Sequence, residues 1–178
     1  MRYTHNERIN GGITMSDFRK QSFSGKPESK AETKPAVEIK GFYKHDKIPL
    51  IDLFDSKALE VAQSLVGKNN KGNLIGVSST QLRRIYDEVK RYEQILSQPN
   101  AKWEEQLPYI KMIKSKLAYS VARQVKNKPE EKGVYTNLEK FLSSSINLIK
   151  DKEDFHVFLS LFEAVYGFYY ELAPKSAL

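Results

Sequence analysis

The chain has 178 residues, a length that fits one folded domain with a tail. It contains no cysteine, which excludes disulfide bonds, thiolate metal sites and thiol nucleophiles. With 29 lysines and arginines against 22 acidic residues, its net charge is +7, which favours a polyanionic partner, nucleic acid first. No apolar stretch has the length of a signal-peptide core or of a membrane span, so we expect a soluble protein with no membrane partner. The absence of cysteine favours the reducing cytoplasm as its location.

Residues 1–49 are predicted to form a flexible basic arm. The segment is rich in Lys, Ser, Glu, Gly and Pro, and its apolar residues are scattered without helical or alternating spacing. Such a composition buries too little apolar surface to offset the entropy of ordering the chain. Two interpretations stay open: an arm that follows nucleic acid, or an unstructured tail or expression leader. The helical bundle domain is then expected over residues 50–178.

A short helix followed by a loop is predicted after the arm. Apolar residues from Leu59 to Val66 recur on one helical face behind a start signal at Asp55 or Ser56, which predicts a helix of two or three turns. Residues 67–76 contain several glycines and asparagines, which are typical of a loop.

A second helix is predicted to begin at Ser78. Ser78 and Gln81 have the spacing of a capping box, in which the serine oxygen accepts an early backbone N–H and the glutamine reaches back to the cap. The helix is expected to end before the break at residues 98–100. Its predicted buried face comprises Leu82, Ile85, Val89, Tyr92 and Leu96.

A third helix is predicted from about Ala101 to Lys126. A bend or restart at Pro108 is an open alternative, because proline removes a backbone donor. The expected inward stripe comprises Ile110, Ile113, Leu117, Val121 and Val125. At 100° per residue, the opposite side gathers Lys116, Tyr119, Arg123 and Lys126.

Two more helices are predicted after a polar turn at residues 129–133. The fifth helix carries a wide aromatic face, which at helical spacing is typical of core, and Pro174 ends it. Its first carboxylates, from Asp151 to Asp154, are expected to be helix-start charges, because the exposed N–H groups there favour anions. No strand-like alternation occurs in the last hundred residues, so the expected fold is all-α, a bundle of about five helices.

The second and third helices carry the candidate binding surface. Residues 78–132 hold twelve basic against seven acidic residues, and local pairs of Arg83 with Asp87 and Arg84 with Glu88 are expected to offset part of that charge. On the third helix, where acidic neighbours are few, the cations can neutralise phosphates while an outward tyrosine stacks on a ribose or base. The alternative is a solvated face with a stray tyrosine. The candidate RNA-binding residues are Arg83, Arg84, Lys90, Lys116, Tyr119, Arg123 and Lys126.

No catalytic residue, metal site or cofactor is predicted. The histidines, His5, His45 and His156, have no further ligands at a fixed spacing that would complete a metal site. The motifs GxxxxGK[ST], GxSxG, HExxH and GxGxxG do not occur in the sequence. The chain is therefore expected not to be an enzyme.

Three stretches, taken in order within residues 48–173, carry a family resemblance: SSTQLRRIYDEVKRYE, LPYIKMIKSKLAYSVARQ and FHVFLSLFEAVYGFYYE. They resemble the small helical subunit of the type III-A CRISPR effector, the Csm complex. The resemblance implies a non-catalytic protein of antiviral defence that stacks in several copies beside other Csm subunits and contacts the backbones of guide RNA and target RNA. The RNA contacts that it implies are Arg83, Arg84, Lys90, Lys116, Arg123 and Lys126.

Three other functions remain as alternatives. The first is a helix-turn-helix-like DNA regulator, although the segment PNAKWEEQ is unlike the compact turn of that motif. The second is a structural adaptor whose basic surface docks an acidic protein. The third is a metal-dependent nuclease.

Overall fold

The computed structural model describes residues 32–177, so residues 1–31 of the predicted arm lie outside the described residues. Within that range the structure confirms the predicted all-α bundle. Its five α-helices are α1 (Ser56–Ser64), α2 (Ser79–Leu96), α3 (Trp103–Asn127), α4 (Lys132–Leu148) and α5 (Lys152–Leu172). Two short 3-10 turns, η2 (Pro129–Glu131) and η3 (Lys175–Ala177), precede α4 and follow α5.

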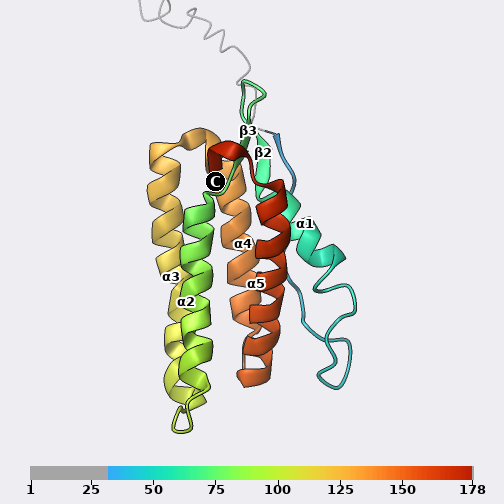
Figure 1. Ribbon diagram of the computed structural model, residues 1–178, viewed down its shortest axis with the longest axis vertical. Helices are drawn as coiled ribbons and strands as arrows, with labels where there is room; N and C mark the ends of the chain where they lie inside the picture. Colours follow the sequence, from blue (N-terminus) through green and yellow to red (C-terminus); the bar gives the residue numbers. More distant parts are fainter. Residues whose placement is uncertain (1–31, 178) are drawn as a thin grey trace, which may run out of the picture.

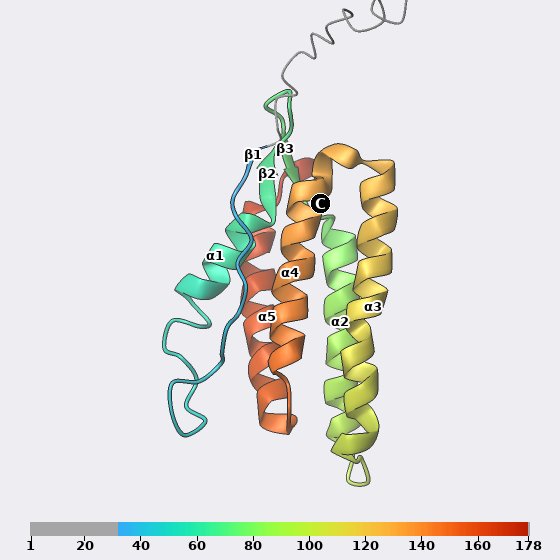
Figure 2. The same ribbon diagram turned by 180° about the vertical axis from the view of Figure 1, so that it is seen from behind.

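Helices α2 to α5 run side by side, and α1 packs on α5 (Figures 1 and 2). Helix α3 packs on α4 and on α2, while α2 also packs on α5. In both views α3 therefore lies at one side of the molecule and α1 at the other. None of the helices in the described residues has the length and apolar character needed to cross a membrane.

An aromatic core joins α4 and α5. The Phe162 ring lies 6.1 Å from the ring of Phe141 on α4, and 6.1 Å from that of Phe158, one turn earlier on α5. All three side chains are buried, so the aromatic face of the fifth helix is core, as its spacing predicts. The predicted stripe of α2 is buried throughout, and that of α3 is buried as far as Val121.

Helix α3 passes through Pro108 without interruption, so the alternative of a restart there is wrong. Proline removes one backbone donor, but the helix is supported on two sides by its packing against α2 and α4. The helix begins at Trp103, whose indole Nε1 donates a hydrogen bond to the Lys150 carbonyl oxygen at 3.1 Å.

The predicted loop at residues 67–76 is instead a β-hairpin. Strands β2 (Val66–Lys68) and β3 (Leu74–Gly76) pair antiparallel, and β1 (Glu32–Thr33) adds to β2. The turn is held by the Asn69 side chain, which accepts from the Lys71 and Asn73 amides at 2.9 and 3.0 Å. Gly72 takes the left-handed conformation that the turn needs, with φ 77°.

The predicted capping box does not form. Ser78 occupies the N-cap position of α2 but its side chain makes no cap hydrogen bond, and Gln81 donates to Ser120 on α3. The Ser78 amide donates instead to the hydroxyl of Tyr135 on α4 at 3.0 Å. The carbonyl of Val77, one residue earlier, accepts from the buried hydroxyl of Tyr169 on α5. Tertiary contacts thus fix the start of α2, where a local motif was predicted.

The described part of the predicted arm, residues 32–49, packs along the bundle. Ile39 and Phe42 are buried, and the Ile39 amide donates to Ser144 on α4 at 3.0 Å. Asn137 of α4 donates to the Lys34 carbonyl at 2.8 Å. Isolated apolar residues therefore anchor this segment although they lack any regular spacing.

Lys47 ties the same segment to the start of α5. Its Nζ lies 2.7 Å from a carboxylate oxygen of Asp151 and 2.6 Å from one of Asp154, and 4.9 Å from the centroid of the Tyr43 ring. The hydrogen bond from Lys47, followed by that from the Asp154 amide, lowers the pKa of Asp151. The Asp151 side chain also caps α5 by accepting from that amide at 2.9 Å, which confirms the expected helix-start role.

This ion pair predicts a pH-dependent stability. Because the pKa of Asp151 is lowered in the folded state, its charge stabilises the fold above the unfolded pKa of about 4, and that contribution disappears as the pH falls through the folded pKa. Asp151→Asn keeps a capping oxygen and removes the charge. We expect the variant to melt below the wild type at pH 7 and the two melting temperatures to converge as the pH falls below the folded pKa of Asp151. Equal melting temperatures at pH 7 would contradict this contribution.

Candidate nucleic-acid interface

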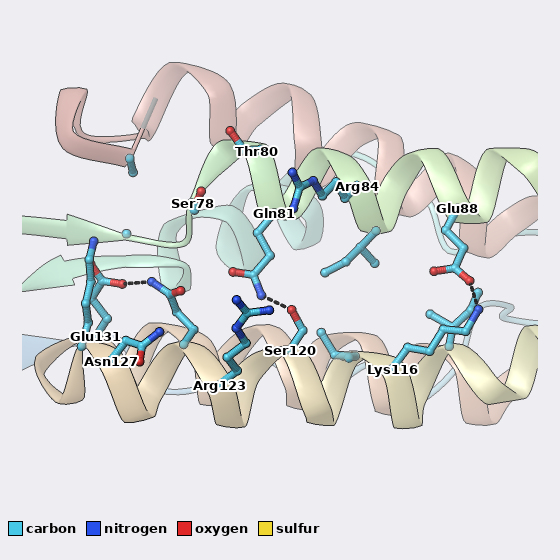
Figure 3. Close-up of a pocket in the computed structure, with 17 residues that line it drawn as sticks. Ser78, Thr80, Gln81, Arg84, Glu88, Lys116, Ser120, Arg123, Asn127 and Glu131 are labelled. Carbon is cyan, nitrogen blue, oxygen red and sulfur yellow. Dashed lines mark hydrogen bonds and ion pairs between the residues drawn. The ribbon is translucent and has the colours of Figure 1, made fainter.

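A groove of about 510 Å³ runs between α2 and α3 (Figure 3). The two helices are antiparallel: Gln81 near the start of α2 bonds Ser120 late in α3, and Glu88 farther along α2 pairs with the earlier Lys116. Buried apolar side chains form its floor: Ile85, Ile113 and Leu117. Its walls carry polar and charged side chains, so the groove has an apolar floor and walls that can form hydrogen bonds.

Both walls of the groove carry an arginine that has no acidic partner among the described residues. Arg84 on α2 and Arg123 on α3 both line the groove, and Figure 3 shows Arg123 extending from α3 toward Gln81 and Ser120. Neither arginine makes an ion pair with any residue that the structure describes. A guanidinium left unpaired at a groove wall can donate in-plane hydrogen bonds to an anion such as phosphate.

Lys116 pairs with an acidic residue that lies far from it in the sequence and on another helix. It forms an ion pair with Glu88 across the groove, so the predicted local pair of Arg84 with Glu88 is replaced by a pair between helices. Acidic residues are few near Lys116 in the sequence, and its partner comes from the neighbouring helix. At the far end of the groove, Lys128 is likewise paired, with Glu131 at 2.9 Å.

The other two candidates on α2 lie outside the groove. Arg83 pairs with Asp87 at 3.8 Å, as its spacing predicts, and both side chains are exposed. Lys90 pairs with Glu93 at 2.8 Å, and this hydrogen bond raises its pKa. Glu163 of α5 also acts on Lys90, which places that lysine on the side of α2 facing α5.

The remaining two candidates stand on the outer surface of α3. The Tyr119 side chain is 71% exposed, and Lys126 is exposed seven residues farther along. Neither lines the groove. Two other large exposed side chains share the helix, Tyr109 and Met112, so α3 presents an aromatic and cationic outer surface beside the groove rim.

Sequence reasoning missed several polar groove residues. Ser120 and Asn127 line the wall of α3 together with Lys116 and Arg123. The signal was present, because these four follow one another at intervals of four, three and four residues, the spacing of one helix face. The spacing of Gln81 from Ser78 predicts a local cap, whereas its side chain lines the groove.

No group of three or more potential metal ligands occurs within residues 32–177. Asp151 and Asp154, two of the carboxylates at the start of α5, bind Lys47. His156 is exposed on α5 with its ring 6.2 Å from that of Phe155, and His5 lies outside the described residues.

Comparison with protein families gives a match to the model described as Csm2 Type III-A, over residues 51–172. Neither curated proteins nor solved structures give a match. The matched range contains both walls of the groove and reaches from just before α1 to the end of α5. Since it covers well over half of the sequence, the chain belongs to the Csm2 family of type III-A CRISPR effector small subunits.

Proposed function

We propose that this subunit is a non-catalytic RNA-binding protein whose α2–α3 groove holds the sugar-phosphate backbone of guide RNA and target RNA. The observation that carries the proposal is the pair of unpaired arginines, Arg84 and Arg123, on opposite walls. Cations on both sides of a groove attract a polyanionic strand, and hydroxyl and amide side chains between them can hydrogen-bond to ribose and phosphate oxygens. Nothing in this arrangement requires a particular base.

The remaining candidates act around the groove in this proposal. Tyr119 and Lys126 extend the binding surface over the outside of α3, where the exposed tyrosine ring offers a stacking platform. Arg83 and Lys90 contribute long-range attraction from the flanks of α2, reduced by their acidic partners. Lys116 contributes after exchanging Glu88 for a phosphate.

The arrangement of α2 and α3 favours RNA over the helix-turn-helix alternative. In that motif two helices cross steeply so that one enters the major groove of DNA. Here the helices lie antiparallel along one another, joined at Gln81–Ser120 and Glu88–Lys116. Neither helix projects from the bundle for insertion into a duplex (Figure 1).

Within the effector, several copies of this subunit stack beside other Csm subunits in the cytoplasm and support antiviral defence. Cleavage and nucleotide synthesis then belong to those other subunits. Membership of the Csm2 family supports this assignment.

Binding of single-stranded RNA is expected to weaken steeply with salt. If the four groove cations, Arg84, Lys116, Arg123 and Lys128, each neutralise one phosphate, the slope of log affinity against log salt is about −3, at roughly −0.7 per phosphate. Fluorescence anisotropy with labelled RNA between 50 and 200 mM salt, roughly the range over which such slopes are resolved, measures it. Affinity that does not change with salt, or that is higher for duplex DNA, would contradict the proposal.

Removing the carboxylate of Glu88 is expected to tighten RNA binding. Glu88→Gln keeps the shape of the side chain and frees Lys116 from the exchange of Glu88 for a phosphate, so affinity rises several-fold, on the order of 1 kcal/mol, while the number of phosphate contacts and hence the salt slope stay the same. Glu105→Gln is the matched control, because Glu105 pairs with Lys102 at the other end of α3. Equal effects of the two substitutions would show a general charge effect in place of a groove contact.

A further inference from the structure

A loop before α1 displays large apolar side chains to solvent. This isoleucine loop, residues 44–55, exposes Ile51 completely, Ile48 to 64% and Phe54 to 36%. Single exposed apolar residues are common on protein surfaces. Three within seven residues, one of them wholly exposed, are instead typical of a surface that another molecule covers.

The isoleucine loop is braced. Around Ile51, the Leu50 amide donates to the Phe42 carbonyl at 2.9 Å and the Leu53 amide donates to the Leu50 carbonyl at 3.1 Å. A bridge between Tyr43 and Pro49 closes the turn at residues 44–48, which places Asp46 and Lys47 in consecutive left-handed conformations, with φ 47° and 58°. That backbone is unfavourable for lysine. The Lys47 side chain holds it in place through its bonds to Asp151 and Asp154 on α5. The isoleucines are therefore presented by a fixed structure, which lowers the entropy cost of binding.

Position and charge separate this loop from the groove. Figures 1 and 2 both show the loop on the α1 side of the molecule, away from α2 and α3. The loop carries three aspartates, Asp46, Asp52 and Asp55, none of which forms an ion pair with a described residue. Against them stand Lys44 and Lys47, and Lys47 is bound by Asp151 and Asp154 of α5, so five carboxylates outnumber two lysines here. In a chain of net charge +7 this is a local acidic surface, which repels RNA.

We infer that the isoleucine loop docks into an apolar pocket with a lysine- and arginine-rich rim on a different protein chain of the effector complex. Ile51 is the anchor that the pocket buries, and the aspartates pair with its rim. The choice of a different chain over a second copy rests on the proposed function, because this chain's own cationic groove is there occupied by RNA. One subunit can then hold RNA on one side and a protein on the other.

Photo-crosslinking in the reconstituted complex tests the inference. p-Benzoylphenylalanine is placed at position 51, and at position 74 as a control, since Leu74 is 60% exposed on β3. The complex is assembled with the other subunits and guide RNA, irradiated and analysed by mass spectrometry. The expected result is a crosslink from position 51 to one other subunit, beside lysine or arginine, and none from position 74. Crosslinks to RNA, to a second copy of this chain or to nothing would overturn the inference.

A substitution gives an independent measurement. Ile51→Asp is expected to reduce incorporation into the complex by about tenfold or more, because burial of one isoleucine is lost, whereas Leu74→Asp leaves it unchanged. Circular dichroism confirms that both variants fold, as complete exposure of Ile51 predicts. RNA binding by each isolated variant is measured separately. If Ile51→Asp is incorporated as fully as the wild type, the docking inference is overturned. If the isolated wild-type protein does not bind RNA, only the proposed function is overturned.

Discussion

The double substitution Arg84→Glu with Arg123→Glu is expected to weaken RNA binding by about a hundredfold or more at 0.1 M salt. Each arginine lines the groove and has no ion pair with a residue in 32–177, so each can make charge-assisted hydrogen bonds worth about 1.5–3 kcal/mol. Loss of two phosphate contacts also flattens the salt slope by about 1.4. Anisotropy titrations at several salt concentrations measure both changes in one experiment.

Two further variants locate the effect. Lys102→Glu reverses an exposed charge near the start of α3, outside the groove, and is expected to change affinity little. Arg123→Glu with Lys126→Glu combines one groove residue with one on the outer surface of α3. If this second pair weakens binding as much as the groove pair, RNA lies over α3. If Lys102→Glu has the same effect as the groove pair, RNA is held by overall charge and the groove is not its site.

The helices could be predicted because their signals are local. Apolar residues recur every three or four positions from Leu82 to Leu96, which places them on one face of a helix. That face is removed from water only when it packs against the rest of the protein. The same holds for Phe158 and Phe162 on α5. Such spacing predicts that a segment is helical, how long the helix is and which of its faces is buried, without knowledge of the elements that pack against it.

The hairpin and the caps could not be predicted because their partners are distant in sequence. Strands β2 and β3 have three residues each, too few for an alternating pattern, and β1 joins them from more than thirty residues upstream. Ser78 and Gln81 satisfy the capping-box spacing, yet each finds a better-placed partner on another helix. Local propensity was overridden there by packing.

The candidate surface was predicted as a set of outward cations, and the structure divides that set. A helical projection separates the residues that face the core from those that face outward. It does not show which neighbouring helix packs beside the residues at the border between the two faces. Lys116 and Arg123 face α2, whereas Tyr119 points away from the groove. Lys90 lies toward α5. Only the pairing of α2 with α3 decides which cations share a groove.

Tyr169→Phe is expected to destabilise the fold by about 1–3 kcal/mol. The Tyr169 hydroxyl is buried and donates to the carbonyl of Val77, immediately before α2, so its removal leaves that carbonyl without this hydrogen bond in an apolar environment. Burial raises the pKa of Tyr169, so the hydroxyl stays protonated and able to donate over the whole neutral range. Tyr169→Ala removes the ring as well and is expected to cost about 3–5 kcal/mol.

The neighbouring residue supplies the control for this prediction. Tyr170 is 65% exposed on the same helix turn, so Tyr170→Phe is expected to change stability by less than about 0.5 kcal/mol. Urea titrations compare the three variants with the wild type. Because Tyr169 and Tyr135 together hold residues 77–78, Tyr169→Phe should also loosen the start of α2, seen as faster amide hydrogen exchange at residues 79–82 than in Tyr170→Phe. If amide exchange at residues 79–82 is equally fast in the two variants, the Tyr169 hydrogen bond does not fix the start of α2, and the packing of α2 against α3 alone positions this wall of the groove.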